Sequence, residues 1–401
     1  MPEEALLWQR LEEISRAVFA LYNFKEIRPP ILEDEALFNR SLGESAEIVQ
    51  KQMFVIKNKE DAYVLRPEGT ASVVRAYLEN NLDKAAGFSK FYYIGPMFRL
   101  ERPQKGRLRQ FSHIGCEAIG SLDYGLDVEI IALAESLLKA AGASGYNVKL
   151  NTLGCPKDKA VLNSVLHKSL KDKLSKLCDD CKARFKKNAL RILDCKIDSC
   201  REAVKSFNIG DGHICPDCKS HFTKVKEGLD SLNISYEYTP LLVRGLDYYT
   251  GTVFEITHPD LGSQDAIGAG GRYNNLVKEL GGPDLGAVGF AFGVERVLLA
   301  SGSRLSVACK SPVYLITLGE EAKKEGLKLL SRLRREGIPC DTDYEGKSLK
   351  GALRKANDLE AKYVLIIGED EIKRGTVTLK DMKSSVQKEV KLADISGELK
   401  C

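Results

Sequence analysis

The sequence predicts an α+β core built on an antiparallel sheet, a mainly helical insertion within that core, and a separate α/β domain at the C-terminus. Two apolar runs joined by a basic loop, between Phe91 and Glu117, predict a pair of long antiparallel strands. The sequence changes character near Cys155 and resumes its first character near Leu241, which indicates an insertion. Beyond residue 311, strand-like and helix-like segments alternate, as in α/β domains.

Length and composition set the broad class of protein. The 401 residues suffice for two or three domains, and 43% hydrophobic with 29% charged residues is ordinary for a soluble globular chain. The net charge of +4 is too small to indicate nucleic-acid binding, so any such binding depends on local patches. The sequence has no run near the roughly 18 apolar residues of a membrane helix, and no secretory signal pattern. We therefore expect a cytoplasmic protein without a membrane segment.

The first ninety residues predict short elements separated by clear breaks. Apolar residues at three- and four-residue spacing predict a helix, and a double proline ends the strand that follows it, because proline cannot donate a hydrogen bond to a neighbouring strand. Thr70 is placed to cap a later helix. The predicted elements are helix 5–22, strand 24–33, strand 52–56, strand 63–65 and helix 71–80.

The two strands between Phe91 and Glu117 suggest a binding site for an anion. Arg99 ends the first strand, and the loop that follows carries Arg102, Lys105, Arg107 and Arg109. Arginine holds phosphate oxygens with two parallel hydrogen bonds, so this arrangement suits a polyphosphate ligand. Arg99 and Glu117 should lie on one sheet, close enough to share a site. A hairpin with a solvated basic tip is the alternative.

The core is predicted to occupy residues 1–150 and 239–300, with the Cys-rich helical insertion at 151–238. Within it we expect helix 127–141, strand 146–152, a strand–turn–strand segment over 241–256 and a glycine-dense turn at 268–273. A strand of small residues from Gly286 then runs into a helix that carries Arg296 in its first turns.

A charged break at 301–311 is expected to be a linker, and residues 312–401 an α/β domain. Strands are predicted at 313–318, 338–342, 363–368, 376–379 and 386–390, with helices at 320–337 and 348–358. The first strand is not followed by a phosphate-binding glycine fingerprint. The helices are rich in Lys and Arg, which is compatible with RNA binding.

Six of the 11 cysteines lie between Cys178 and Cys218, which in a reducing compartment points to a metal site. Two Cys-x-x-Cys pairs, Cys178 with Cys181 and Cys215 with Cys218, have the spacing of a structural Zn²⁺ site. Cys195 and Cys200 lie between the pairs and are alternative ligands. Reduced cysteines within a small helical domain are the other interpretation.

The ordered set of motifs resembles the class II aminoacyl-tRNA synthetases and, within them, the bacterial-type histidyl-tRNA synthetase family. The strand that ends in a double proline, the hairpin with Arg99 and the glycine-rich strand and helix with Arg296 resemble the three class II motifs. The finer resemblance covers almost the whole chain and lies in four stretches: LRPEGT at 65–70, RPQKGR at 102–107, RGLDYY at 244–249 and GGRY at 270–273.

The resemblance implies that histidine reacts with ATP to give histidyl-adenylate and that the histidyl group then passes to the 3′ end of tRNA(His). ATP with Mg²⁺, L-histidine and tRNA(His) are the implied ligands, and a homodimer is the implied assembly. The implied phosphate-binding and catalytic residues are Arg99, Arg107, Arg244 and Arg296, with Phe111 stacking on adenine. The implied histidine-binding residues are Glu68, Thr70, His113, Glu117, Arg244, Tyr248, Tyr249 and Tyr273.

The sequence departs from the family pattern at two places. His113 stands where the family usually has glutamine, and an imidazole N–H can also donate to the substrate carboxylate. The family usually has a short strand before the first helix, whereas this sequence opens at Met1-Pro2-Glu3. The competing interpretation is the synthetase-like, histidine-sensing regulatory subunit of ATP phosphoribosyltransferase. That subunit commonly lacks the C-terminal domain and the catalytic arginines.

Overall fold

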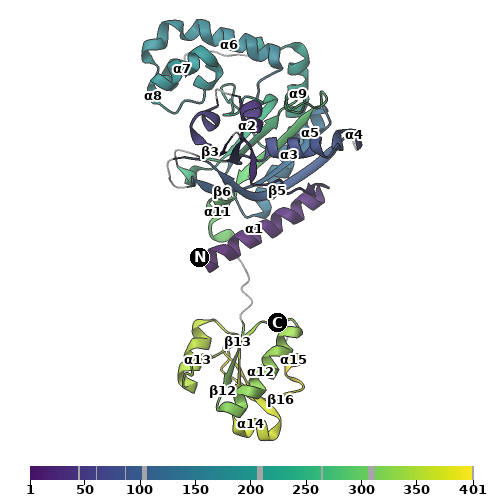
Figure 1. The fold of residues 1–401 in the computed structure, drawn as a ribbon, viewed down its shortest axis with the longest axis vertical. Coiled ribbons are helices and arrows are strands. Elements are labelled where there is room, and N and C mark those ends of the chain that lie inside the picture. The colour runs from purple at the N-terminus through teal and green to yellow at the C-terminus, as the bar shows by residue number, and fades with distance from the viewer. Residues whose placement is uncertain are drawn as a thin grey trace. The chain divides into compact units, whose positions relative to one another are not determined.

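The computed structural model describes residues 1–43, 46–59, 61–85, 87–101, 106–205, 211–262, 265–305 and 312–399. The chain divides into two compact units, residues 1–307 and residues 308–401. Figure 1 colours the chain from its N-terminus to its C-terminus. The predicted arginine and lysine at 102 and 105 lie outside the described residues.

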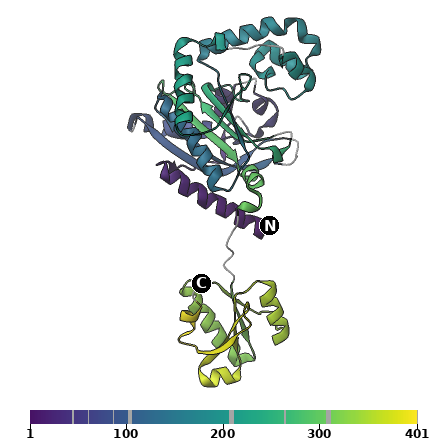
Figure 2. The ribbon, with the colours of Figure 1, turned by 180° about the vertical axis from the view of Figure 1, so that it is seen from behind.

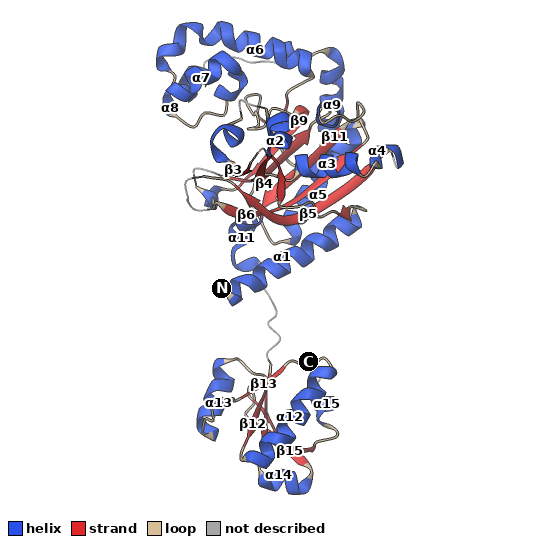
Figure 3. Cartoon of the chain, in the orientation of Figure 1, coloured by secondary structure: helices blue, strands red, loops and turns tan. Residues whose placement is uncertain are grey.

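The first unit is built on an eight-stranded sheet with the order β1-β5-β6-β11-β10-β9-β7-β8 (Figure 3). The six central strands pair antiparallel, and the two short edge strands pair parallel with their neighbours. This confirms the predicted α+β core on an antiparallel sheet. The strands are β1 (Lys25–Glu26), β5 (Ser89–Phe98), β6 (Gln110–Ile119), β7 (Asn147–Thr152), β8 (Glu237–Tyr238), β9 (Thr250–Thr257), β10 (Ala266–Arg272) and β11 (Ala287–Gly293).

Alternation along the strands gives the sheet two chemically different faces. On β6, Ile114, Cys116 and Ala118 point into a large apolar cluster, whereas His113 and Glu117 point to the opposite face. The apolar cluster is covered by four helices, and Figure 2 shows the first of them, in purple, along this side. These helices are α1 (Pro2–Leu21), α5 (Tyr124–Ala140), α9 (Pro216–Ser231) and α11 (Val294–Ser301).

The opposite face of the sheet is only partly covered. A second apolar cluster packs there around α2 (Glu35–Leu42), α3 (Thr70–Glu79) and α10 (Leu276–Glu279), and α4 (Leu82–Ala85) follows α3. Because this face also carries polar residues of β6, it is the face on which a binding site can form.

A small antiparallel sheet lies beside these helices, with the order β2-β4-β3. Its strands are β2 (Leu32–Asp34), β3 (Phe54–Asn58) and β4 (Asp61–Leu65), and a π-helix, Ile48–Gln52, leads into β3. The predicted strand 24–33 is therefore split, since Pro29 and Pro30 interrupt it. The buried guanidinium of Arg66 donates to the carbonyl of Pro29 at 2.7 Å and to that of Pro96 at 3.0 Å, which fixes this break against the large sheet.

The inserted segment contains a part with its own apolar cluster, which includes buried residues from Leu162 to Val204. It consists of α6 (Pro156–Leu170), α7 (Asp179–Lys187), α8 (Asp198–Lys205) and 3-10 turns at Lys171–Lys176 and Ala189–Ile192. Figure 1 shows α6, α7 and α8 grouped together. By contrast, α9 packs on α5, and its buried Phe222, Val225 and Leu229 belong to the cluster of the large sheet.

The second unit has a five-stranded mixed sheet with the order β13-β12-β14-β15-β16, in which β12 is parallel to both β13 and β14. The remaining pairs are antiparallel, so the α/β domain expected here is present. Its elements are β12 (Val313–Thr317), α12 (Glu320–Arg335), β13 (Cys340–Thr342), α13 (Leu349–Asp358), β14 (Tyr363–Ile367), α14 (Glu369–Arg374), β15 (Thr376–Asp381), β16 (Gln387–Lys391) and α15 (Ile395–Glu398). Across the described parts of both units, no helix combines the length and the apolar character that crossing a membrane requires.

Two local predictions are wrong. The first strand of the predicted strand–turn–strand segment over 241–256 is absent, and only its second strand forms, as β9. Asn151 instead donates its side-chain amide to the backbone carbonyls of Pro240 and Leu242, at 3.0 and 2.9 Å. The glycine-dense segment 268–273 lies mostly in strand β10 instead of a turn. A Cβ on Gly270 would lie 2.4 Å from the carbonyl oxygen of Gly289, so glycine is required there for close approach of strands.

Candidate active site

A cavity of about 340 Å³ opens on the polar face of the large sheet. It is lined from β5, β6, β10 and β11, from the segment 244–249 and from the 3-10 turn at Ala189–Ile192 of the inserted segment. All of the residues predicted to bind ATP or histidine line it: Glu68, Thr70, Arg99, Arg107, Phe111, His113, Glu117, Arg244, Tyr248, Tyr249, Tyr273 and Arg296.

Glu117 is the centre of a buried polar group in this cavity, which also contains Thr70 and Tyr273. One carboxylate oxygen accepts from the hydroxyl of Thr70 at 2.7 Å, and the other accepts from Tyr273 at 2.5 Å. The side chain is 1% exposed, and burial raises its pKa to about 8, against the opposing effect of these hydrogen bonds. A Cβ on Gly289 would lie 2.0 Å from Glu117, so the neighbouring strand must present a glycine to leave room for this carboxylate.

Glu68 is held in place by the start of α3. Its two oxygens accept from the backbone N–H groups of Thr70 and Ala71, at 2.7 and 2.9 Å. The prediction that Thr70 caps this helix is therefore wrong: Glu68 satisfies the free N–H groups, which leaves the Thr70 hydroxyl for Glu117. Burial raises the pKa of Glu68, and the two backbone hydrogen bonds oppose that rise.

Arg99, Arg107 and Arg296 form a cationic group at another part of the cavity. Arg99 donates to the carbonyl of Pro67 at 2.8 Å, and its guanidinium lies 5.3 Å from the centre of the Phe111 ring. Arg107 pairs with Glu101 at 3.0 Å. Burial lowers the pKa of Arg296, and the charges of Arg107 and Arg99 add to that effect, so the three cations are electrostatically close.

Arg244 begins the segment that closes the cavity from the side of the insertion. Its guanidinium pairs with Glu255 on β9, and its buried Nε has no hydrogen-bond partner among the described residues. Burial acts to lower the pKa of Arg244, but Glu255 outweighs it and the pKa is raised. Backbone carbonyls of Asp247 and Tyr249 each accept from the ammonium of Lys159 at 2.9 Å, which holds the paired tyrosines toward the cavity.

His113 lies between the two polar groups. Its Nδ1 atom is buried and has no hydrogen-bond partner within the described part of the chain. Burial lowers the pKa of the imidazole to about 3, and the charges of Arg99, Arg66 and Arg296 contribute. The ring is therefore neutral at physiological pH and carries one N–H donor.

Comparison with known proteins identifies the class of molecule. The family model described as histidyl-tRNA synthetase matches residues 1–297, and one described as an anticodon binding domain matches residues 312–401. The chain belongs to the histidyl-tRNA synthetase family. The histidine–tRNA ligase of Thermodesulfovibrio yellowstonii is 47% identical over 98% of this chain and 94% of its own length. That of Geobacter sulfurreducens is 43% identical over 98% of this chain and 95% of its own length.

Solved structures of the family have the same fold. The apo histidyl-tRNA synthetase of S. aureus matches with a TM-score of 0.82 and 31% identity, over 100% of this chain and 97% of its own. The predictions of family, class II fold and enzyme class, an aminoacyl-tRNA ligase, are thereby confirmed. A Bacillus halodurans structure titled as an ATP phosphoribosyltransferase regulatory subunit/histidyl-tRNA synthetase matches at 23% identity, with a TM-score of 0.67, and shares the fold.

Several cavity residues were missed from the sequence. Tyr93 donates to Glu117 at 3.4 Å, Glu255 pairs with Arg244, and Glu101 pairs with Arg107. Alternation along β5 was an available signal for Tyr93. Side chains two residues apart point to the same face of a strand, so Tyr93 lies on the same face as Arg99. The pairing of Glu255 with Arg244 depends on packing between segments and had no local signal.

Arg272, in the GGRY motif, has a different place from its neighbour Tyr273. Its guanidinium is 1% exposed, donates to the Asp127 carboxylate at 2.7 Å and to the carbonyl of Ser121 at 2.9 Å, and does not line the cavity. Arg272 therefore joins β10 to helix α5, and only Tyr273 of this pair reaches the cavity.

The cysteines of the insertion fall into two separate groups. Cys178 and Cys181 lie with Cys195 and Cys200, while Cys215 and Cys218 lie with Cys155 and Asp158. The two Cys-x-x-Cys pairs therefore do not share one site, whereas Cys195 and Cys200, the alternative ligands, lie with Cys178 and Cys181. The reason is that α7, the turn after it and α8 fold onto one another, whereas Cys215 precedes α9, which packs on the core.

Proposed function

We propose that the chain ligates L-histidine to tRNA(His) in two steps, with ATP and Mg²⁺, at the cavity described above. The observation that carries the proposal is one cavity in which a buried carboxylate, hydrogen-bonded to Tyr273 and Thr70, adjoins a group of arginines. The first part suits an imidazole with two ring nitrogens, and the second suits a triphosphate.

The carboxylate part of the cavity would bind histidine. Glu117 and Tyr249 would contact the imidazole, and Glu68 with Thr70 would hold the α-amino group, while Tyr248 and Tyr273 enclose the side chain. A ring N–H that donates to Glu117 favours its ionised form, which burial alone disfavours. Binding of histidine is therefore coupled to loss of the Glu117 proton at neutral pH.

The arginine part would bind ATP. Arg99 would hold the α-phosphate, Arg296 the γ-phosphate and Arg107 the bent triphosphate, and Phe111 would stack on adenine with the ring face that Arg99 does not cover. ATP would bind as its Mg²⁺ complex, and the metal would offset part of the phosphate charge that these arginines face. Arg244, whose Nε is a buried donor without a partner among the described residues, would bridge the substrate carboxylate and the α-phosphate.

The reaction then needs alignment and charge stabilisation instead of a covalent group of the enzyme. A carboxylate oxygen of histidine forms a bond to the α-phosphorus, and the bond from that phosphorus to the bridging oxygen of pyrophosphate breaks. In the second step a hydroxyl at the 3′ end of tRNA attacks the histidyl carbonyl carbon, and AMP leaves. His113 would donate its N–H to the substrate carboxylate during the first step.

The partners follow from the same proposal. The second unit, which matches the anticodon-binding family, would contact the anticodon of tRNA(His), and the inserted segment would contact the acceptor stem. We infer a homodimer and a cytoplasmic location, where tRNA is charged. The unpaired state of the described cysteines agrees with a reducing compartment.

The regulatory-subunit alternative is less supported. Arg99, Arg244 and Arg296 all line the cavity, and the second unit is present, whereas the alternative commonly lacks these features. The likeness to the Bacillus halodurans structure concerns the fold alone.

The test is histidine-dependent exchange of pyrophosphate into ATP by the purified chain. We expect exchange in the wild type and a decrease of at least roughly 100-fold in Arg244→Ala, because a charged donor to the reacting groups is lost. The matched control is Arg10→Ala on the exposed surface of α1, where the arginine pairs with Glu13 at 3.4 Å, and we expect it to be unchanged. A wild type that binds histidine but does not catalyse exchange would favour the regulatory alternative.

A further inference from the structure

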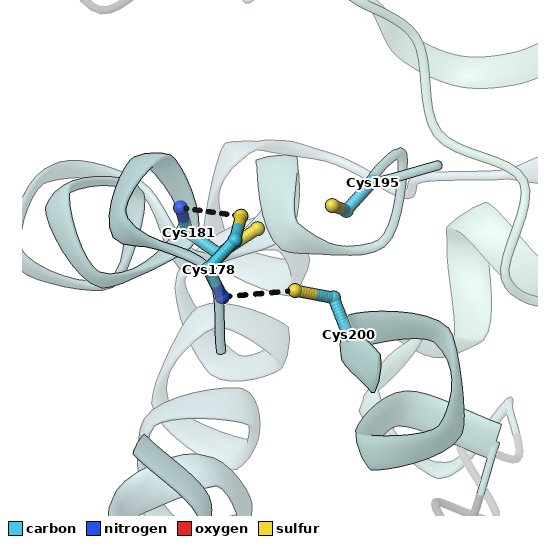
Figure 4. A group of neighbouring side chains, drawn as sticks. All are labelled: Cys178, Cys181, Cys195 and Cys200. Atoms are coloured by element: carbon cyan, nitrogen blue, oxygen red, sulfur yellow. Dashed lines mark hydrogen bonds between the residues drawn. The ribbon is translucent and has the colours of Figure 1, made fainter. Parts of the chain in front are cut away.

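The four sulfur atoms of Cys178, Cys181, Cys195 and Cys200 lie within 4.8 Å of one another. Figure 4 shows the four side chains converging from three segments on one small space. We propose that these four thiolates bind one structural Zn²⁺ ion, which fixes the inserted segment against the active site. The binding of the metal does not depend on the proposed catalytic function.

The donor set and its spacing fit a tetrahedral zinc site. Four thiolates are a common ligand set of structural Zn²⁺, and Zn–S bonds of about 2.3 Å place the sulfur atoms about 3.8 Å apart. All four sulfur atoms lie within 4.8 Å of one another, so small side-chain movements would bring them to that separation. None of the four is in a disulfide, and three of them are buried, so the group is protected from competing ligands.

The backbone around the group supports thiolates. The N–H of Cys178 points at the sulfur of Cys200 at 3.2 Å, and the N–H of Cys181 points at the sulfur of Cys178 at 3.4 Å (Figure 4). Such donors stabilise the charged form of a metal-bound sulfur. Cys178 is also the N-cap of α7, so its sulfur lies at the positive end of a nine-residue helix.

The size of the inserted part gives a reason for a metal. Its separate apolar cluster has a dozen buried residues, three of which are these cysteines. So small a core rarely holds several short helices together without a cross-link. A metal bound by Cys178 and Cys181 at the start of α7, by Cys195 shortly after the Ala189–Ile192 turn and by Cys200 in α8 would join the three segments that this cluster joins weakly.

The same segment reaches the active site through Arg191, which lies between the second and third ligands in the sequence. Its guanidinium donates to the Asp247 carboxylate at 2.9 Å and to the carbonyl of Gly245 at 2.9 Å. Both acceptors belong to the segment 244–249 that closes the cavity. Arg191 is thus a positioning residue, and the metal would hold it in register. This consequence rests on the proposed function, unlike metal binding itself.

The second group does not carry the same inference. Asp158 accepts from the backbone N–H of Cys155 and of Cys215, both at 3.1 Å, so its carboxylate already serves the starts of α6 and α9. These two hydrogen bonds of Asp158 are enough to explain why Cys155 and Cys215 lie close together. Cys218 of this group, a partly exposed cysteine, provides a matched control for the proposed ligands.

The test measures zinc in the full-length chain, purified under reducing conditions and loaded with Zn²⁺. We expect Cys200→Ser to lose about one equivalent of zinc relative to the wild type, whereas Cys218→Ser should retain zinc at the four-cysteine site. After replacement by Co²⁺, the wild type and Cys218→Ser should show the charge-transfer bands of a four-thiolate site, and Cys200→Ser should lose them.

A second variant keeps the test decisive if the Cys200→Ser protein does not fold. Cys178→His replaces a partly exposed thiolate with imidazole, another zinc ligand, and should retain the metal with a shifted Co²⁺ spectrum. Removing zinc from the wild type should lower the melting temperature by several degrees, and added Zn²⁺, but not Mg²⁺, should restore it. The proposal is overturned if the wild type takes up no zinc, if Cys200→Ser retains the wild-type amount, or if reduced protein re-forms disulfides among these cysteines in place of metal binding.

The effect on the active site has its own readout. With zinc removed, the KM for histidine in pyrophosphate exchange should rise by roughly 10-fold, and Arg191→Ala should show the same rise while keeping its zinc. An unchanged KM in both would overturn the link to the active site. Loss of exchange in zinc-loaded wild type would instead contradict the proposed function.

Discussion

At the scale of single residues, chemistry-bearing side chains were easier to predict than their partners. The resemblance to the histidyl-tRNA synthetase family implied many of the arginines, tyrosines and carboxylates that line the cavity. It did not show that Glu68 caps α3, that Arg191 holds Asp247, or that Glu255 pairs with Arg244. Arg191 and Asp247 are 56 positions apart, and a single sequence does not show which distant residues meet. The cap at Glu68 depends on where α3 begins, and the pairing of Glu255 with Arg244 depends on how the chain between them turns, so neither had a local signal.

His113 allows a residue-scale prediction, because the family usually has glutamine there. His113→Gln retains an N–H donor for the substrate carboxylate, so the KM for histidine should stay within about 3-fold of the wild type. His113→Phe has a ring but no donor, and its KM should rise by roughly 10-fold or more. Pyrophosphate exchange at varied histidine concentration measures both, and equal KM values for the two variants would rule out a donor role.

The same substitution should change the response to acid. The folded pKa of His113 is about 3, below its ordinary value of 6.5, so the unfolded chain binds a proton that the native protein does not bind between those values. Stability is therefore lost as pH falls below about 6.5, on the order of 2 kcal/mol at pH 5. His113→Gln removes this contribution, and unfolding by denaturant at pH 7 and pH 5 should show a smaller loss than in the wild type.

At the scale of elements, long periodic segments were predictable and short irregular ones were not. The hairpin of β5 and β6, the strand and helix with Arg296 and most of the second unit agree with the sequence pattern. The start of the segment 241–256 was predicted as a strand because it opens with three apolar residues, but side-chain hydrogen bonds from Asn151 and Arg191 take the carbonyls of Leu242 and Gly245. The segment from Gly268 to Arg272 was predicted as a turn because glycine is frequent in turns. Glycine also allows close approach of neighbouring strands, and this second role applies here.

The small sheet β2-β4-β3 makes a prediction about assembly. In its register, Leu32, Ile56 and Tyr63 share one face with Phe54 and Leu65, while Val64 and Glu33 lie buried on the other. Leu32 and Ile56 are each 47% exposed, so this face is an apolar surface close to the double proline at Pro29 and Pro30. We expect a second copy of the chain to cover it in the proposed homodimer.

Ile56→Glu tests this assembly, because a charge without a partner would be buried at the interface. The dissociation constant of the dimer should rise by roughly 100-fold, as measured by sedimentation over a dilution series. The control is Leu232→Glu, which alters a similarly exposed residue, 52% exposed, just after α9. If Ile56→Glu dissociates no more readily than the control, another surface forms the dimer.

At the scale of the whole molecule, the chain consists of two units whose apolar clusters do not share residues. The clusters of the first unit contain described residues up to Leu305, and those of the second begin at Val313. The predicted linker 301–311 starts too early in its described part, because Ser301 ends α11 and Leu305 is buried in the cluster of the first unit. Because each unit has its own core, each should keep its fold without the other.

The division predicts that the two chemical steps can be separated by truncation. Every residue that lines the cavity belongs to the first unit, so a chain that stops after residue 311 should retain histidine-dependent pyrophosphate exchange within about 3-fold. Charging of tRNA(His) at low tRNA concentration should fall by roughly 100-fold or more, because the unit that matches the anticodon-binding family is lost. The same fragment without its Arg244 guanidinium (Arg244→Ala) controls for contaminating synthetase. Circular dichroism and thermal melting show whether the fragment folds. If a folded fragment loses both exchange and charging, the second unit acts on the cavity and the two cores are not functionally independent.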